Sequence, residues 1–296
     1  MGNMIISGFK HKKASKQQKD QKKPSSINEL SKPSCDKPIF MSIFRNTTGY
    51  KDDPNEEIDR LHSQHYLYRH AWKGNFSAPI HERLIEGIYV LDVGCGPGTW
   101  LLDMASSYPT SKFMGIDLFP QFPSEVKPKN CEFLTADLLE GLPFEWNEQV
   151  IKELTRLTKP GGFVELMDVH MPARDLPPKA KKISDMIIAE MERDNLWWDV
   201  TSHFEFLLSS QLNLSGVTSQ KKKHVIVVKE DDQEGGLFLE YFVGILKIVY
   251  PQISKKTNIS PEVFYNEFMP RVIEEFSAKE HSPYILTERV FAQKIA

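Results

Sequence analysis

Residues 88–99 read IYVLDVGCGPGT, and this stretch decides the fold. Its first half is a continuous apolar run, which is typical of a strand buried on both faces of a sheet. Its second half is a glycine-rich turn, and apolar residues from Thr99 to Tyr108 then recur at helical spacing. A strand, a glycine turn and a helix in this order form one βα unit of a parallel α/β sheet.

Strands and helices alternate along most of the chain. Further strands are predicted at 112–116, 131–136, 163–169, 224–228 and 284–292. Helices are predicted at 55–69, 79–86, 99–108, 147–158, 181–194 and 237–250, and from Pro261 onward. This alternation predicts the α/β class, with a doubly wound, mostly parallel sheet and helices on both of its faces.

One connection in this pattern is too short. Only nine residues, 138–146, separate Asp137 from the helix predicted at 147. A further parallel strand would need a crossover of at least ~10 to 12 residues in addition to the strand itself. This connection therefore cannot hold a further strand together with its crossover.

The first forty residues differ from the rest of the chain. They contain nine lysines and three acidic residues, a net charge of +6, whereas the remainder has a net charge of −9. Few of them are apolar, so burial cannot offset the entropy of ordering them. We predict a disordered basic tail over 1–40 and one domain over 41–296, whose C-terminal helices cover the substrate side.

Composition also excludes several classes of protein. No apolar stretch approaches the ~20 residues of a membrane-spanning helix, so an integral membrane protein is excluded. The acidic body lacks the basic balance of a nucleic-acid-binding surface, and no nucleic-acid partner is expected. Three widely spaced cysteines favour a reducing compartment, the cytoplasm or alternatively the nucleus. The oligomeric state is left open.

The glycine turn and the acidic residues after the strands indicate a nucleoside site. The turn Gly94–Gly98 has the spacing Gly-x-Gly-x-Gly, and Thr99 stands where a dinucleotide fingerprint has its third glycine. Asp117 ends the next strand, where a carboxylate can accept both hydroxyls of a ribose. With Asp92 and Asp137, three acidic residues lie at successive strand ends, which favours a nucleoside without phosphates.

At these positions the sequence resembles the class I S-adenosylmethionine-dependent methyltransferases, and in particular a large fungal subgroup of them. The resemblance extends from about residue 55 to the C-terminus. It rests on Arg60, Gln64-His65, Asn75-Phe76, 90–98, Trp100, 115–117, 130–133, 141–144, 159–162 and 164–166.

The resemblance implies a Rossmann-like methyltransferase fold that binds S-adenosylmethionine. That fold has a fourth parallel strand between Asp137 and the helix at 147, so the nine-residue connection leads us to expect this strand to be missing. If the strand at 163–169 moves in beside the strand at 88–93, a six-stranded sheet remains. The cofactor-binding residues that it implies are Arg60, His65, Asp92, Gly94, Cys95, Gly96, Gly98, Asp117, Leu118, Asp137 and Leu138. Among them, the glycine turn would contact the methionine part, Asp117 the ribose, and Asp137 with Leu138 the adenine. Arg60 and His65 would close the pocket. No metal site is expected, and no catalytic residue is assigned.

The expected function is methyl transfer to an unidentified small-molecule acceptor. One alternative is a cofactor-binding regulatory protein that has lost activity with the missing strand. A less favoured alternative is a nicotinamide-dependent oxidoreductase, against which Thr99 argues. His170 follows a predicted strand, and a polar loop residue is preferred there over a general base.

Overall fold

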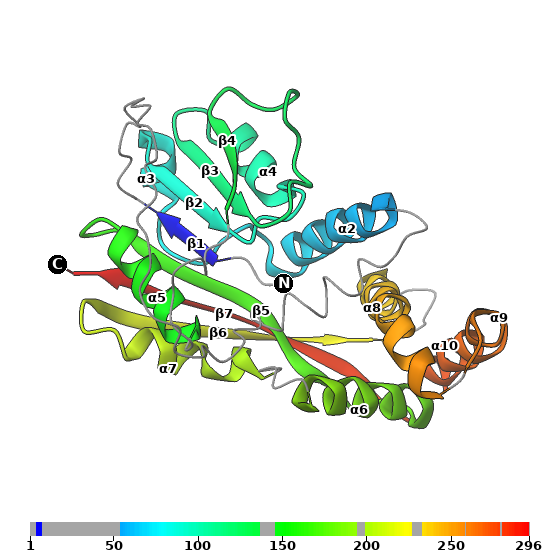
Figure 1. Ribbon diagram of the computed structural model, residues 1–296. Coiled ribbons are helices and arrows are strands. Elements are labelled where there is room, and N and C mark those ends of the chain that lie inside the picture. Colours follow the sequence, from blue (N-terminus) through cyan, green and yellow to red (C-terminus); the bar gives the residue numbers. More distant parts are fainter. Residues whose placement is uncertain are drawn as a thin grey trace, which may run out of the picture.

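The structure of the protein is a computed structural model that describes residues 4–7, 54–136, 146–193, 199–226, 233–257, 259–278 and 280–295. A seven-stranded sheet with the order β4-β3-β2-β1-β5-β7-β6 forms its centre (Figure 1). The strands are β1 (Met4–Ser7), β2 (Tyr89–Val93), β3 (Lys112–Asp117), β4 (Cys131–Thr135), β5 (Phe163–Arg174), β6 (Leu214–Val225) and β7 (Tyr284–Lys294).

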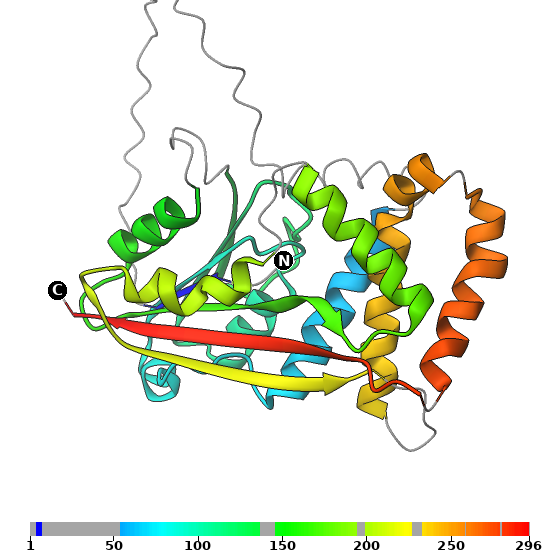
Figure 2. The same cartoon turned by 90° about the horizontal axis from the view of Figure 1, so that it is seen from below.

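Helices cover both faces of this sheet, as predicted for the α/β class (Figure 1 and Figure 2). The α-helices are α2 (Pro54–Trp72), α3 (His81–Glu86), α4 (Thr99–Ser107), α5 (Trp146–Leu157), α6 (Pro178–Arg193), α7 (Phe204–Ser209), α8 (Gln233–Thr257), α9 (Pro261–Val263) and α10 (Met269–Ser277). Two shorter helical segments are η1 (Val200–His203) and η2 (Phe264–Phe268).

Alternating side chains of the central strands explain the two helical layers. On one face, Val164 and Leu166 of β5 pack with apolar residues of α5 and α7. On the other face, Phe163 packs in a cluster with α3 and α4, and Met167 in a cluster with α2, α6 and α8. Because strand residues point alternately to opposite faces, one strand contributes to both cores.

Five of the seven strands of the sheet run in the same direction. β2 pairs in parallel with β3, and β3 with β4. β7 runs antiparallel to both β5 and β6, and β1 runs antiparallel to both β2 and β5. The mostly parallel sheet predicted from the sequence is therefore confirmed for the direction of the strands, with β1 and β7 reversed.

β1 occupies the position in the sheet where the fourth parallel strand was expected to be missing. This strand lies between β2 and β5, with Ile5 opposite both Asp92 and Glu165. The conditional arrangement in which the strand at 163–169 lies directly beside the strand at 88–93 is therefore not formed, because β1 separates them. Without β1, the facing backbone groups of both neighbours would lack partners inside the sheet.

β1 also corrects the prediction of a disordered tail over residues 1–40. Residues 4–7 form a strand, whereas residues 8–40 lie outside the described residues. The four residues MIIS are apolar apart from the serine, but the lysine-rich stretch that follows them dominates the composition of this segment.

Within the described ranges, no helix combines the length and apolarity required to cross a membrane.

Most predicted elements agree with the structure, with one substantial difference at β6. This strand begins at Leu214, ten residues before the predicted start at His224. The additional residues are mostly polar and partly exposed, and they pair with β7.

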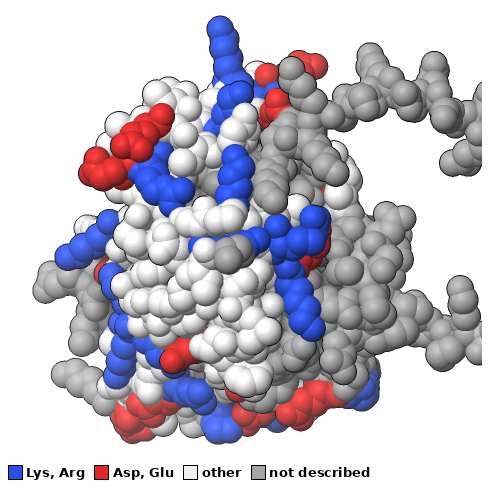
Figure 3. Space-filling model, turned by 90° about the vertical axis from the view of Figure 1, so that its left-hand side faces the viewer, with Lys and Arg blue, Asp and Glu red and all other residues white. Residues whose placement is uncertain are grey.

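Figure 3 shows one face of the molecule, on which Lys and Arg side chains are dispersed among uncharged surface.

Candidate functional site

A cavity lies at the carboxyl ends of β2 and β3, where ligands bind in open α/β sheets. The turn after β2 supplies Gly94–Pro97 to its wall, and Asp117 and Phe119 follow from β3. Residues of α2 line a second side of the cavity. Met167 of β5 and Arg289 of β7 line it beyond β1. The site therefore extends across most of the sheet.

The glycine turn has a left-handed backbone at three positions. Gly94 has a φ of +75°, and a Cβ added there would meet no atom within 4 Å. Gly96, with a φ of +54°, also lines the cavity. At Gly98, however, a Cβ would lie 2.5 Å from the ring of Phe133. Gly98 therefore permits close packing of the turn on β4, and it does not line the cavity.

Asp117 connects the two strand ends through hydrogen bonds. Its Oδ2 accepts a hydrogen bond from the Gly96 amide at 2.8 Å, and its Oδ1 accepts one from the Phe119 amide at 2.9 Å. Each carboxylate oxygen has further lone-pair capacity. The side chain can therefore hold the turn and still accept hydrogen bonds from two hydroxyl groups of a ligand.

Asp92 lies fully buried beneath this turn. Neither carboxylate oxygen has a hydrogen-bond partner among the described residues. Burial, together with the nearby charge of Asp117, raises the pKa of Asp92 to about 8. Asp92 is therefore predominantly protonated at neutral pH, so the cavity floor carries less negative charge than the sequence indicates.

Arg60 is fixed at the side of the cavity formed by α2. Its Nε and Nη2 donate to the two carboxylate oxygens of Glu57 at 2.8 and 2.9 Å. Its Nη1 donates to Gln64 Oε1 at 3.1 Å. Burial lowers the pKa of Arg60, but the hydrogen bond and charge of Glu57 outweigh it, and the net shift is upward. This arrangement positions the guanidinium group and neutralises its charge.

Asp103 of α4 holds α2 and the segment after it in place. His65 Nε2 lies 3.2 Å from Asp103 Oδ2, and Arg69 Nη1 donates to Oδ1 at 3.2 Å. The amide of Asn75 donates to Oδ2 at 2.8 Å. Burial lowers the pKa of His65 despite the opposing effect of Asp103, which favours the neutral imidazole. His65 thus joins two helices as well as lining the cavity.

The N-terminus of α4 is covered by α2. The Thr99 hydroxyl lies 2.7 Å from His62 Nδ1, and both Thr99 and Trp100 are buried. Dinucleotides place their pyrophosphate at the N-terminus of the equivalent helix. Here the side chain of His62 occupies the approach to that helix end.

The structure brings six of the residues implied by the resemblance to one cavity, namely Arg60, His65, Gly94, Cys95, Gly96 and Asp117. Leu118 is not among the cavity-lining residues. Asp137 and Leu138 lie outside the described residues. Burial raises the pKa of the Cys95 thiol far above its ordinary range, which disfavours the thiolate that a nucleophile requires.

The cavity wall contains further polar residues that the sequence did not assign to the site, among them Tyr68, Glu165 and Arg289. Glu165 accepts hydrogen bonds from the amides of Ser77 and Ala78, at 2.9 and 2.8 Å for the shortest contacts. A charged residue inside an apolar strand was the available signal at 165.

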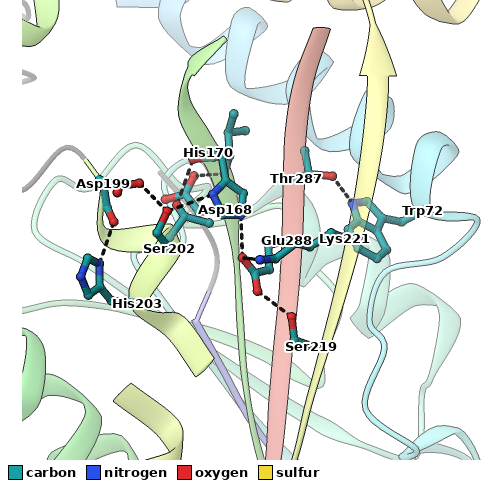
Figure 4. A network of polar contacts seen from close by, with 12 residues as sticks. Trp72, Asp168, His170, Asp199, Ser202, His203, Ser219, Lys221, Thr287 and Glu288 are labelled. Carbon is teal, nitrogen blue, oxygen red and sulfur yellow. Dashed lines mark hydrogen bonds and ion pairs between the residues drawn. The ribbon is translucent and has the colours of Figure 1, made fainter. Parts of the chain in front are cut away.

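His170 is outside the cavity and belongs to a separate polar network (Figure 4). It is a buried strand residue, so the predicted loop position was wrong. Its Nε2 lies 2.6 Å from Glu288 Oε2, and its Nδ1 lies 3.3 Å from the Ser202 hydroxyl. Ser219 donates to the other oxygen of Glu288 at 2.6 Å. The network connects β5, β6, β7 and η1.

Curated fungal proteins are similar to part of the chain. The protein named N-methyltransferase verN, from Clonostachys rogersoniana, is 32% identical over 137 residues, which cover 38% of this chain and 47% of verN. Secondary metabolism regulator laeA from Aspergillus flavus is 37% identical over 117 residues, covering 36% of this chain and 30% of laeA. The matched region spans less than half the length of these two relatives.

A solved structure and a protein family also match. Phosphoethanolamine N-methyltransferase 2 from Haemonchus contortus, solved with S-adenosylhomocysteine, is 11% identical. That match covers 79% of this chain and 58% of the other, with a TM-score of 0.40. Residues 90–149, which contain the glycine turn and Asp117, match the family described as Methyltransferase domain. This segment of the chain is therefore similar to a methyltransferase domain.

Proposed function

We propose that the chain binds S-adenosylmethionine and transfers its methyl group to a small-molecule acceptor. One observation carries the proposal: the glycine turn Gly94–Gly98 and Asp117 are hydrogen-bonded to each other at the ends of adjacent parallel strands. Both contribute to one cavity, and both lie in the segment that matches the methyltransferase family.

The residues present fit this cofactor. Asp117 has the capacity to accept the two ribose hydroxyls. Asn75 lines the cavity, and its buried Oδ1 has no hydrogen-bond partner among the described residues. This acceptor suits the ammonium group of the methionine part. Leu61, Phe119 and Met167 supply apolar surface around it.

The contacts of Thr99 argue against a nicotinamide dinucleotide. Its hydroxyl is engaged by His62 at the start of α4, where a pyrophosphate would need open backbone amides. A nucleoside bonded through sulfur to an amino acid has no phosphate and makes no such demand. The cavity therefore favours S-adenosylmethionine over NAD.

When bound, the cofactor supplies a methyl group activated by a positively charged sulfur. The chain's own contribution is positioning and the exclusion of water. Asp117 and the glycine turn orient the nucleoside, while α2, held by the bonds of Asp103 to His65 and Arg69, covers the site. Arg60 is neutralised by Glu57, which limits its repulsion of the cationic sulfur.

Calorimetry with S-adenosylhomocysteine and NADH tests the cofactor assignment. We expect binding of S-adenosylhomocysteine and no measurable binding of NADH. Incubation with S-adenosylmethionine carrying a labelled methyl group and a mixed small-molecule extract then tests transfer. NADH binding, or failure of S-adenosylhomocysteine to bind, would contradict the proposal.

A second candidate is a regulatory protein that binds the cofactor without turnover. The similarity to a protein named secondary metabolism regulator supports it, as does the reversed strand β1 in the sheet position next to β2. Cofactor binding combined with no labelled product from any small-molecule fraction would favour this candidate.

A further inference from the structure

The segment that follows α2, residues 74–78, is held by side chains from three other elements. Arg289 of β7 donates a hydrogen bond to its first carbonyl at 3.0 Å, and Trp100 of α4 donates one to its second carbonyl at 2.9 Å. Glu165 of β5 accepts the amides of its fourth and fifth residues at 2.9 and 2.8 Å. The segment belongs to no helix or strand, so these bonds are what fix its backbone beside the cavity.

Asp103 of α4 fixes the direction of the Asn75 side chain. Its Oδ2 accepts a hydrogen bond from Asn75 Nδ2 at 2.8 Å. A carboxylate oxygen accepts hydrogen bonds, so the amide presents its nitrogen to Asp103 and turns its oxygen away. His65 and Arg69 contact the same carboxylate. All three of these residues line the cavity and Asp103 does not, so Asp103 orients the wall from behind.

The amide oxygen is the polar side-chain atom of Asn75 that is left for a ligand. Oδ1 is buried and has no hydrogen-bond partner in the described part of the chain. Buried polar atoms rarely stay unpaired, because the free energy of removing them from water is then not recovered. Asn75 lines the cavity, so a ligand there can supply the missing donor.

The surroundings of Asn75 favour a cationic donor. The hydrogen bond from Nδ2 to the Asp103 carboxylate polarises the amide and increases the negative charge on Oδ1. Each arginine of the cavity wall faces a carboxylate: Arg60 with Glu57, Arg69 with Asp103 and Arg289 with Glu165. Their positive charges are therefore balanced, and an ammonium group is the donor that best matches the polarised oxygen.

We propose that Asn75 selects for the ammonium group of the cofactor and that Asp103 is the positioning residue that aims its amide, an inference that rests on the proposed methyltransferase function and deepens it. S-adenosylmethionine carries one ammonium group, on its methionine part. Trp100, which donates to the Asn75 carbonyl, is the second residue of α4 and comes just after the glycine turn. The Asn75 backbone is therefore attached beside the turn that would contact the methionine part, which favours the cofactor over an amine acceptor as the source of the donor.

Calorimetry with three ligands tests this selection. S-adenosylhomocysteine is compared with an analogue that lacks only the amino group and an analogue that lacks only the carboxylate. For the unchanged protein, removal of the amino group should weaken binding at least about tenfold, the effect of one lost hydrogen bond to a charged group. Asn75→Leu should abolish most of this preference in both amino-containing ligands and leave the affinity for the analogue without the amino group unchanged.

Two further variants test the positioning role of Asp103. Asp103→Ala leaves the Asn75 amide free to rotate and should reduce the preference for the amino group. Asn75→Asp combined with Asp103→Asn reverses donor and acceptor within the pair and keeps an oxygen for the ligand, so the preference should return. Asn266→Leu, an exposed change in η2, is the control and should alter neither the melting temperature nor any of the three affinities. A purely structural role of Asp103 would weaken all three ligands alike.

The ligand comparison on the unchanged protein requires no variant to fold. Equal affinity for S-adenosylhomocysteine and its analogue without the amino group would overturn the selection and leave the proposed function intact. Full preference in a folded Asn75→Leu variant would overturn the role of Asn75, and failure of the exchanged pair to restore the preference would overturn that of Asp103. No binding of any of the three ligands would overturn the proposed function together with this inference.

Discussion

The Asp117 carboxylate accepts a hydrogen bond from the Gly96 amide at 2.8 Å, so one side chain both fixes the glycine turn and lines the cavity. Asp117→Ala removes this bond and the bond from Phe119. We expect a loss of about 1–3 kcal/mol in the free energy of unfolding and at least about tenfold weaker binding of S-adenosylhomocysteine. Chemical denaturation and calorimetry measure the two effects.

Glu125→Ala is the control for this change, because Glu125 is an exposed acidic residue in the segment after β3. Glu125→Ala should change neither the free energy of unfolding nor the affinity for S-adenosylhomocysteine. Full affinity in a folded Asp117→Ala variant would contradict the role of Asp117 in holding the ribose.

Asp92 should make the stability of the unliganded protein dependent on pH. Its folded-state pKa of about 8 lies above its ordinary value of 3.8. The folded state therefore holds more protons between these values, and stability falls as pH rises from about 4 to about 8, by up to ~1.4 kcal/mol per pH unit. Asp92→Asn should remove this slope. Denaturation curves at pH 5, 6, 7, 8 and 9 would reveal it, and parallel pH profiles for both proteins would show that Asp92 ionises normally.

Glu165 should stabilise the region under the cavity. Glu165→Ala leaves the amides of Ser77 and Ala78 without their acceptor and leaves the buried Arg289 without its nearest counter-charge. We expect a loss of about 3–5 kcal/mol in the free energy of unfolding. Glu165→Gln keeps an acceptor oxygen and should lose less.

Glu240→Ala, an exposed change on α8, provides the comparison for the Glu165 variants. Urea denaturation of the Glu165→Ala, Glu165→Gln and Glu240→Ala variants gives the order of their free energies of unfolding. Equal stability of the Ala and Gln variants would show that the acceptor oxygen of Glu165 contributes nothing.

Prolines in β1 test whether this strand completes the sheet. Ile5→Pro combined with Ile6→Pro removes backbone donors from a strand paired on both sides. We expect the melting temperature to fall by several degrees and cofactor affinity to weaken, because β1 supports β2 just before the glycine turn. A control with prolines at Gln17 and Gln18 should have no such effect. Unchanged melting of the β1 variant would show that the sheet is stable without it.

The fold class could be predicted from the sequence because the residues that determine it lie close together in the chain. The apolar run at 88–93, the glycines after it and the helical spacing from Thr99 all lie within twenty-one residues. The strand β1 was not readable, because its four residues carry too little pattern to outweigh the lysine-rich sequence beside them. Its pairing with Val93 and Leu166 depends on contacts between distant segments.

The site was predicted where a sequence motif exists. Gly94, Gly96 and Asp117 line the cavity as the motif implies. Tyr68 and Arg289 come from α2 and β7, and no spacing relates them to each other or to the glycine turn. Only the tertiary packing of those two elements on β5 brings them to one wall, so they could not be recognised from the sequence.

The placement of β1 determines the order in which the sheet can form. Met4 pairs with Val93 on one side and with Leu166 on the other. β1 precedes β5 in the sequence, so it must wait until β5 has been made before its second edge is covered. Until then, β2, β3 and β4 can assemble as a local parallel unit, whereas the centre of the sheet depends on pairings of high sequence separation. Such pairings slow folding and leave strand edges open to association with other chains.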